Sequence, residues 1–423
     1  MSPRLKQILL LVGAAFILLI ILVVLGVLPG LRSTPLSASL QFWGLDDDRQ
    51  TWQPIIEAFQ KQYPNVQISY QEISEVNYED RLINALAAGK GPDIFTLKNY
   101  WITKHQDKTY PLPQSFGFSS ADFKKNFVDA AADDLITSSG RIIGLPMFMD
   151  TPVLLYNKDI FNTKGIAKIP SSWEEITAVA LEITDKSQTG EIINSGLALG
   201  ATKNIDHFFE IISSVFLQKG DNIVNRSYSR PDLSENSAGA LSFYISFADS
   251  SQKNYIWSGR AVNSLDSFAQ ERAAMVFALP EDIARVKAKN PHLNFAVLPF
   301  PQFTNSRPVV YGSHAFPAVS RFSRSPEAAW RFILFAAGQE GAKLYTDATS
   351  HPPARRDLLA QGAPKEELQP NFRQTLIAKS WLVPDEAGAK NIFQEAVASV
   401  LSKILTPQQA VNQIENKLRI LFP

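Results

Sequence analysis

The chain has 423 residues, of which 45% are hydrophobic and 19% charged, the composition of a globular protein with room for two or three domains. Its 41 lysine and arginine residues balance its 41 aspartate and glutamate residues, so no overall field recruits nucleic acid or acidic polymers. The chain has no cysteine, which excludes disulfides, thiolate catalysis and cysteine-based metal sites.

An uncharged apolar run near the start, Ile8 to Leu28, predicts a transmembrane helix. At about 1.5 Å of rise per residue, it spans roughly the 30 Å of a hydrocarbon core. A cleavable signal has a shorter apolar region of about 7–15 residues, so we expect this run to stay as an anchor. Arg4 and Lys6 precede the run and only Arg32 follows soon after it, which places residues 1–7 in the cytoplasm. The sequence thus predicts a single-pass protein of the cell membrane with its bulk on the extracytoplasmic side.

Residues 29–39 form a linker rich in Ser, Thr and Pro, and an alternation of strands and helices follows it. The two amphipathic helices of this part end at Pro64 and at Gly89. In chain order the segments are LQFW, TWQPIIEAFQKQYP, VQISY, YEDRLINALAAG and DIFTL. The alternation predicts an α/β fold with a mostly parallel sheet and right-handed crossovers.

The stretch ALAAGKGPDIF, Ala85 to Phe95, has a Gly-Lys-Gly core that invites comparison with a phosphate-binding loop. Such a loop needs G-x-x-x-x-G-K-[ST] between a strand and the following helix, so that helix amides face the phosphate. Here the glycines follow a helix and precede a strand, and Lys90 is followed by Gly91 and Pro92 with no hydroxyl. Context and motif both argue against a nucleotide site.

A second region begins with a dense apolar run, Ile142 to Phe161, that prolines interrupt. Helical patterns follow in PSSWEEITAVALEIT, IDHFFEIISSVFLQKG and SAGALSFYISFAD, and in FAQERAAMVFAL a helix runs into a strand. NFAVLPFP is typical of a strand that leaves this region, VVYGSHAFPAVS of a further strand, and SPEAAWRFILFAAG of a helix. The last third is mainly helical, so the chain as a whole indicates two α/β lobes plus C-terminal helices.

Several of these segments, in this order, resemble the extracellular solute-binding proteins of ABC importers, family 1, the group that includes maltose-binding protein. The segments are WQPIIEAFQKQYPNVQISY, LINALAAGKGPDIF, GLPMFMDTPVLLYNKDIFNTKGI followed by PSSWEEI, FAQERAAMVFA, VLPFP, and SPEAAWRFILFAAGQEGAKLY before HPPARRDL. The resemblance implies a two-lobe type II periplasmic-binding-protein fold that closes over one solute. The expected units are residues 40–145 and 301–355 for lobe 1, 146–300 for lobe 2, and 356–423 for the C-terminal helices.

Four residues at the carboxyl ends of predicted lobe 1 strands are candidate ligand contacts. Trp43 closes the first strand, where its flat ring could carry the C–H face of a sugar or could lie in the core under the next helix. Asn99, Tyr100 and Trp101 directly follow the DIFTL strand, at the position from which the resembling proteins supply polar and aromatic contacts. Together these side chains predict a ligand-binding edge of lobe 1.

The remaining candidates lie at the lobe crossings and in lobe 2. Asp150 matches the position of a ligand-binding carboxylate in the resembling family, and an acid in so apolar a run needs a hydroxyl, an amine or a cationic neighbour. Asn204 and Asp206 open the HFFEII helix, although Asp206 could serve only as the cap of that helix. Trp257 and Tyr311 each lie near a predicted loop or lobe crossing, and each could be core instead. Tyr311 and Gly312 fit a strand end that lines the cleft.

We therefore expect a membrane-tethered receptor that binds a small solute, for which a carbohydrate is the favoured class, and passes it to the transmembrane subunits of an ABC permease. No cofactor, metal or nucleic acid is expected. An enzyme is the main rival class: the five histidines are isolated and no HExxH or G-x-S-x-G motif occurs, but two acids from distant segments could still form a glycoside hydrolase. A tethered sensor that reports its ligand without transport would use the same closing motion.

Overall fold

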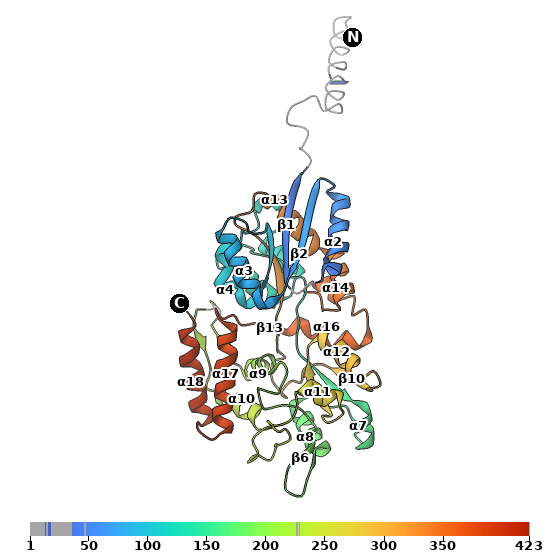
Figure 1. Cartoon of the computed structure of the whole chain (residues 1–423), viewed down its shortest axis with the longest axis vertical. Coiled ribbons are helices and arrows are strands. Elements are labelled where there is room, and N and C mark those ends of the chain that lie inside the picture. The colour runs from blue at the N-terminus through green and yellow to red at the C-terminus, as the bar shows by residue number, and fades with distance from the viewer. Residues whose placement is uncertain are drawn as a thin grey trace, which may run out of the picture.

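The structure is a computed structural model that describes residues 13, 16, 17, 36–45, 48–225, 227 and 229–422. Figure 1 shows two halves, one above the other, joined by several segments of chain. Each half is built on its own sheet, one of four strands and one of three. We call the upper half lobe 1 and the lower half lobe 2.

The sheet of lobe 1 has the strand order β12-β3-β1-β2. Strand β1 (Ala38–Leu45) lies parallel to β2 (Val66–Ile73) and to β3 (Ile94–Lys98). Strand β12 (Ala315–Val319) runs antiparallel to β3 and comes from chain that has already passed through lobe 2. The three parallel strands confirm the predicted α/β architecture for this lobe, and two separate stretches of chain build the sheet.

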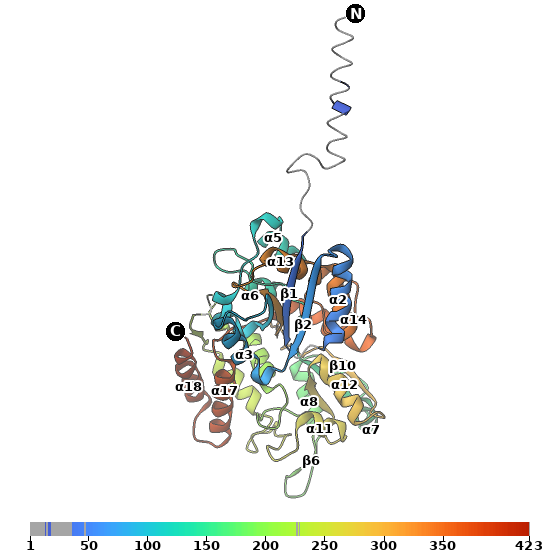
Figure 2. The same cartoon turned by 45° about the horizontal axis from the view of Figure 1, so that its top comes forward.

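Helices cover both faces of this sheet, and Figure 2 shows α2 alongside β2. Helix α2 (Arg49–Gln62) starts at Asp48, whose carboxylate accepts from the Gln50 amide at 3.0 Å, and its apolar stripe is buried against β1 and β2. Within the stripe, the Trp52 ring lies edge-on to Phe42 of β1, with ring centroids 4.6 Å apart. The other helices of this lobe are α3 (Glu75–Ala87), α4 (Ile102–His105), α5 (Ser120–Asn126), α6 (Asp129–Leu135), α13 (Pro326–Ala336), α14 (Gln339–Thr349) and α15 (Arg356–Leu359).

The Gly-Lys-Gly stretch is a helix-to-strand turn, as its context predicts. Helix α3 ends at Ala87, and Gly89 follows with φ of 66°, the left-handed conformation that glycine adopts without a Cβ clash. Strand β3 then starts at Ile94, and the Asp93 carboxylate accepts from the Gln41 amide of β1 at 3.0 Å. The turn therefore serves to join β3 to β1 within the sheet.

The sheet of lobe 2 is antiparallel, unlike the parallel strands β1, β2 and β3 of lobe 1. Its order is β10-β4-β9, and both β9 (Met275–Ala278) and β10 (Phe295–Leu298) run antiparallel to β4 (Val153–Asn157). No strand direction was predicted from the sequence for this lobe, because these short, buried strands show no alternation that would reveal it.

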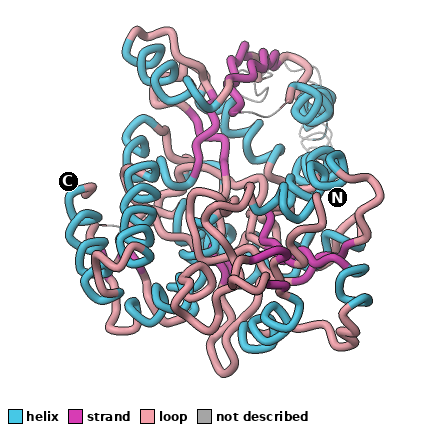
Figure 3. The backbone as a smooth tube through the Cα atoms, turned by 60° about the horizontal axis from the view of Figure 1, so that its bottom comes forward, coloured by secondary structure: helices cyan, strands magenta, loops and turns pink. Residues whose placement is uncertain are grey.

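Helices and two short hairpins surround this second sheet, and α17 (Glu386–Leu401) and α18 (Pro407–Ile420) pack on α10 at its side. Figure 3 shows helices around the periphery with the strands between them. The helices are α7 (Lys158–Thr163), α8 (Trp173–Ile183), α9 (Phe208–Gln218), α10 (Ser237–Ile245), α11 (Ser264–Ala269) and α12 (Pro280–Lys289). The hairpins pair β5 (Asp185–Lys186) with β6 (Ile192–Asn194), and β7 (Ile223–Val224) with β8 (Pro231–Asp232).

Short elements lie where the chain passes between the lobes. Strand β11 (Val310–Tyr311) pairs in parallel with β13 (Ala378–Lys379), which follows α16 (Gln369–Gln374). Single-turn helices are η1 (Asn99–Trp101), η2 (Gln106–Lys108), η3 (Gln114–Phe116), η4 (Glu366–Leu368) and η5 (Thr375–Ile377).

The buried Gln374 side chain joins two of the passing segments. Its amide nitrogen donates to the Thr151 hydroxyl and to the Pro152 carbonyl, each at 2.7 Å. Its amide oxygen accepts from the Phe300 amide at 2.8 Å. Because the side chain is almost fully buried, these bonds satisfy polar groups that would otherwise lose water without compensation.

The predicted transmembrane run, residues 8–28, lies outside the described residues apart from Gly13, Phe16 and Ile17, so the anchor stays a prediction. Within the part of the chain that the structure describes, none of the helices combines the length and the apolar character needed to cross a bilayer.

Replacing Gly144 should destabilise the protein, because a Cβ there would overlap the ring of the fully buried Phe316 of β12. We expect Gly144→Ala to lower the free energy of unfolding by about 1–3 kcal/mol, the usual effect of overpacking a core. Urea unfolding followed by tryptophan fluorescence measures it. The control is Gly239→Ala in α10, where a Cβ meets nothing within 4 Å, so stability should stay equal or rise. Equal stability of the two variants would contradict the tight packing at Gly144.

Candidate functional site

A cleft of about 280 Å³ lies between lobe 1 and the start of α17. Helix α3, η1 and α4 form its upper wall, and the chain that leads into α17 forms its lower wall; Figure 1 places these in the upper and lower halves. The lining residues are Glu75, Val76, Glu79, Asp80, Tyr100, Trp101, Lys104, Pro384, Asp385, Glu386 and Ala387. The cleft thus combines two aromatic rings with several charged groups, most of them acidic.

Tyr100 belongs to the upper wall of the cleft. Its hydroxyl donates to Glu75 Oε1 at 3.3 Å, and Glu75 is ion-paired with Lys98. Burial, followed by the carboxylates of Glu386 and Glu75, raises the pKa of Tyr100. Tyr100 therefore stays a neutral phenol that can donate a hydrogen bond at physiological pH.

A partly buried pair of charges lies at the start of α17, in the opposite wall. Lys390 Nζ lies 3.3 Å from Glu386 Oε1, one turn away in α17. Burial raises the pKa of Glu386, and Lys390 partly offsets this rise. Burial opposes the charged form of Lys390, but Glu210 of α9 and Glu386 outweigh burial and raise its pKa. This wall therefore offers the carboxylates of Asp385 and Glu386 to hydroxyl groups of a ligand, with the Lys390 ammonium next to Glu386.

Trp101 and Trp43, two predicted ligand contacts, have different surroundings. Trp101 lines the cleft and stacks on Tyr78, with ring centroids 5.8 Å apart and planes at 10°. Trp43 does not line the cleft: its side chain is buried in β1, and the Arg81 guanidinium lies 5.1 Å from its ring centroid. Only Trp101 and Tyr100 of the predicted aromatic residues come together at this cleft.

Asn99 is fully buried behind Tyr100 in a polar network. Its amide nitrogen donates to Asp134 Oδ2 at 3.3 Å, and the Ser380 hydroxyl donates to Asp134 Oδ1 at 2.6 Å. His314 Nε2 lies 3.0 Å from Asp134 Oδ2. This network ties η1 to α6 and to the chain after β13, so it fixes the position of Tyr100.

Asn204 and Trp257 contact each other within lobe 2. The Trp257 indole donates to Asn204 Oδ1 at 3.2 Å, and the Asn204 amide nitrogen donates to the Ser258 and Ala261 carbonyls, each at 3.0 Å. Neither residue lines the cleft. Their contacts hold a loop of lobe 2 to its core.

Asp206 holds the start of α11. Its carboxylate accepts from the Ser264 hydroxyl at 2.9 Å and from the Leu265 amide at 3.1 Å. The alternative that it caps α9 is wrong, because His207 occupies the N-cap position of α9, with φ of 57°.

Tyr311 and Gly312 belong to the crowded crossing beside β13. Tyr311 is buried next to Phe209, with ring centroids 6.3 Å apart, and its amide donates to the Ser214 hydroxyl at 2.9 Å. A Cβ at Gly312 would fall 2.8 Å from Met149 Sδ. The side chains of Met149 and Ala378 therefore leave no room for a larger residue at this position.

Asp150 lies at the crossing into lobe 2, paired through its backbone with Ser313. Its Oδ1 is 2.9 Å from His351 Nδ1, so the buried acid has the polar partner that its burial requires. Glu281, at the start of α12, faces the same pair. Crowding by protein, followed by the charge of Asp150, raises the pKa of Glu281, although its side chain keeps contact with solvent.

Sequence reasoning missed the charged residues of the cleft, chiefly Glu75, Glu79, Lys104 and Glu386. Glu75 and Glu386 each stand in the first turn of a helix, where acids are favoured without any ligand. Nothing in their spacing could show that these two helix starts face each other across the cleft.

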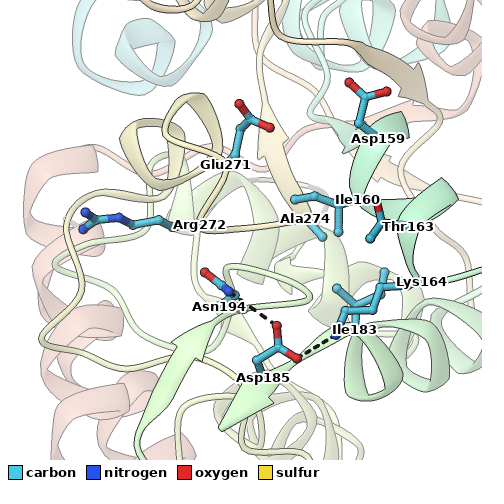
Figure 4. Close-up of a pocket in the computed structure, with 11 residues that line it drawn as sticks. Asp159, Ile160, Thr163, Lys164, Ile183, Asp185, Asn194, Glu271, Arg272 and Ala274 are labelled. Atoms are coloured by element: carbon cyan, nitrogen blue, oxygen red, sulfur yellow. Dashed lines mark hydrogen bonds and ion pairs between the residues drawn. The ribbon is translucent and has the colours of Figure 1, made fainter. Parts of the chain in front are cut away.

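Lobe 2 has a second hollow of about 230 Å³, shown in Figure 4. Lys164 and Asn194 both bond to Asp185 on its floor, and Glu271 and Arg272 stand at its other side. No residue of lobe 1 lines this hollow. A ligand there would touch one lobe only, so it could not drive the lobes together.

Within lobe 2, His207 forms a charged pair with Asp282 of α12. Its Nε2 lies 2.5 Å from Asp282 Oδ2, and Arg285 Nη1 lies 2.6 Å from Asp282 Oδ1. Burial opposes the charged imidazole, but the hydrogen bond to Asp282 and the charge of Glu210 outweigh it and raise the pKa of His207 to about 9. The imidazole is therefore positively charged at neutral pH.

The profile of the bacterial extracellular solute-binding protein family matches residues 43–343. This chain belongs to that family. The solute-binding protein is 22% identical to the galactooligosaccharide-binding protein of Bacillus subtilis (strain 168) over 342 residues, which are 77% of this chain and 75% of the relative.

Solved structures share the fold of this solute-binding protein. The cyclic alpha-maltosyl-1,6-maltose binding protein from Arthrobacter globiformis superposes with a TM-score of 0.76 at 16% identity, covering 91% of this chain and 99% of that one. A cyclo/maltodextrin-binding protein complexed with maltotetraose gives 0.73 at 17% identity, with 92% and 98% covered. At such identities the likeness shows the two-lobe fold.

The His207–Asp282 pair should make stability depend on pH. The imidazole pKa rises from 6.5 to about 9 on folding, so the stabilisation is fully present below pH 6.5 and is lost as the pH rises through 9. We expect His207→Gln to destabilise the protein by at most on the order of 3 kcal/mol at pH 6 and by much less at pH 9.5. Melting temperatures at both pH values measure the difference. The exposed His292 provides a control, since His292→Gln should follow the wild type at both pH values; a His207→Gln deficit that is equal at both would contradict the charged pair.

Proposed function

We propose that this protein is an extracytoplasmic receptor that binds a carbohydrate in the cleft between its lobes and delivers it to an ABC permease. The observation that carries the proposal is the aromatic and charged cleft between lobe 1 and α17, in a chain of the solute-binding family. The curated and solved relatives named above bind oligosaccharides by their own descriptions, which favours this ligand class.

The chemistry of the cleft suits a sugar. The rings of Tyr100 and Trp101 offer apolar surface to the C–H face of a pyranose, while charged groups on both walls can bond to its hydroxyls. Tyr100 already bridges towards Glu75 above and Glu386 below, through the interactions that raise its pKa. A sugar hydroxyl could replace Glu75 or Glu386 as the hydrogen-bond partner of the Tyr100 hydroxyl. The Tyr100 hydroxyl would then keep a hydrogen bond when the ligand binds.

Closure would follow from contact with both walls. A ligand held by lobe 1 and by α17 together binds more tightly to the closed arrangement, and it shifts the population towards that arrangement by this difference in affinity. We propose that residues 40–145 with 301–355 move as one unit, and residues 146–300 as the other, with residues 356–423 as C-terminal helices. The permease would then recognise the closed form.

The proposed location follows from the apolar run at residues 8–28. A retained helix there would tether the receptor in the cell membrane with its bulk outside, close to the permease. No catalytic step is proposed, since the family is one of binding proteins.

Thermal-shift screening of the full chain in mild detergent tests the carbohydrate assignment. Maltooligosaccharides, galactooligosaccharides and monosaccharides should be compared with polyamines and peptides. We expect at least one sugar to raise the melting temperature in a saturable manner, because a ligand that binds only the folded state stabilises it by mass action. The sugar should be recovered intact by chromatography. Hydrolysis of the sugar would instead support a glycoside hydrolase, and stabilisation by non-sugar ligands alone would refute the carbohydrate assignment.

Removing the Tyr100 side chain should weaken binding of the stabilising sugar. We expect Tyr100→Ala to raise the Kd at least about tenfold, since it removes both an aromatic platform and a buried donor. Isothermal titration calorimetry measures the change. Tyr110→Ala is the matched control, because Tyr110 belongs to the same lobe but does not line the cleft. Equal affinities of the two variants would place the sugar elsewhere.

A further inference from the structure

Three side chains that can ligate a metal converge beside the lobe crossing. They are Asp150 of the crossing segment, Glu281 in the first turn of α12, and His351 in the loop after α14. One ligating atom from each lies within 4.8 Å of the other two. The three residues come from separate segments, so the folded arrangement alone brings them together.

Two of these side chains are held in place before any ion binds. Asp150 is 6% exposed, and its backbone exchanges two hydrogen bonds with Ser313, at 2.9 and 3.0 Å. The His351 ring stacks on Phe148, with centroids 4.5 Å apart, and points Nδ1 at Asp150 Oδ1 from 2.9 Å. A carboxylate and an imidazole in fixed orientation form the rigid part of a metal site.

Glu281 completes the cluster from lobe 2. Its side chain is exposed, so it can rotate towards the other two without disturbing a packed core. Two carboxylates this close repel each other, and a cation between them would replace the repulsion by attraction. The neighbouring Asp282 is not available as a fourth ligand, because it bonds to His207, to Arg285 and to the Leu279 amide.

We propose that Asp150, Glu281 and His351 bind a divalent transition-metal ion of the Zn²⁺ class. One imidazole with two carboxylates is a donor set that suits Zn²⁺, whereas Ca²⁺ and Mg²⁺ prefer oxygen ligands alone. Three protein ligands leave one tetrahedral position for water.

The geometry needs only small side-chain movements to accept the ion. With metal–ligand bonds of about 2.0–2.2 Å, ligand atoms around a tetrahedral Zn²⁺ lie roughly 3.4 Å apart. The 2.9 Å separation between His351 Nδ1 and Asp150 Oδ1 would widen by a few tenths of an ångström, and Glu281 would move inwards. The ion takes the place of the hydrogen bond between them, and any proton on Nδ1 leaves on binding.

Such an ion would link the two lobes. Helix α12 belongs to lobe 2, and His351 lies two residues after the end of α14 of lobe 1, with Asp150 in the chain that joins the lobes. The ion would favour the arrangement in which α12 and the end of α14 are close. This proposal does not depend on a carbohydrate ligand, because none of its three residues lines the cleft at Tyr100.

Thermal denaturation of the full chain after chelator treatment, with Zn²⁺, Mn²⁺, Ca²⁺ or Mg²⁺ added back, tests the site. We expect Zn²⁺ at about 100 times its Kd to raise the melting temperature by about 3 °C, and Ca²⁺ and Mg²⁺ to give little change. His351→Ala should weaken Zn²⁺ binding at least about tenfold in competition with a fluorescent zinc chelator. Glu281→Gln, on an exposed side chain that the fold does not need, should do the same.

His292→Ala is the matched control, because it removes an exposed histidine that lies apart from the cluster in lobe 2. It should bind Zn²⁺ as the wild type does. Equal Zn²⁺ affinity of His351→Ala, Glu281→Gln and His292→Ala would overturn the proposal and show adventitious binding at the surface. An absent response of the wild type to every ion would overturn it as well. Sugar affinity, measured separately, distinguishes either result from failure of the receptor assignment.

Discussion

The rest of the structure depends on how the chain passes between the lobes. Asp150 and Ser313 pair through their backbones, and the Met149 amide donates to the Pro352 carbonyl. The buried Gln374 side chain bonds to Thr151 and Pro152, before the first strand of the lobe 2 sheet, and to Phe300, after its last strand. Each of these bonds is buried, so breaking one without access to water is costly. The crossing therefore keeps one register.

The cleft inherits its geometry from this crossing. Asp134 binds Asn99, Ser380 and His314 at once, which connects η1 of lobe 1 to chain that comes from lobe 2. Tyr100 follows Asn99 directly and so is held facing the start of α17. A residue that makes no cleft contact thus decides where the aromatic platform stands. The backbone bonds of Asp150 to Ser313 and of Met149 to Pro352 likewise hold Asp150 and His351 close to α12.

Local pattern was sufficient to predict much of the fold. The stripe of Trp52, Ile55 and Phe59 specified α2, and the glycines after α3 specified a turn into β3, because both signals act within a few residues. The ordered segments also indicated the family. The direction of the lobe 2 strands could not be predicted from the sequence. Strands such as β4 and β9 are buried at every position, so their residue pattern is the same for parallel and antiparallel pairing.

The sequence by itself determined the strands and helices of two α/β lobes, with Tyr100 and Trp101 after a strand end, because periodicity is a local property. The solute-binding family was indicated by the resemblance of the ordered segments. Only the tertiary structure decided that Trp43 contacts Arg81 and that Trp257 bonds to Asn204, each within its own lobe. Only the tertiary structure placed Glu75 and Glu386 in the same cleft. Only it brought Asp150, Glu281 and His351 together. These contacts join residues that are far apart in the chain. The packing of whole helices and sheets sets the distances between them, and the spacing of residues in the sequence does not.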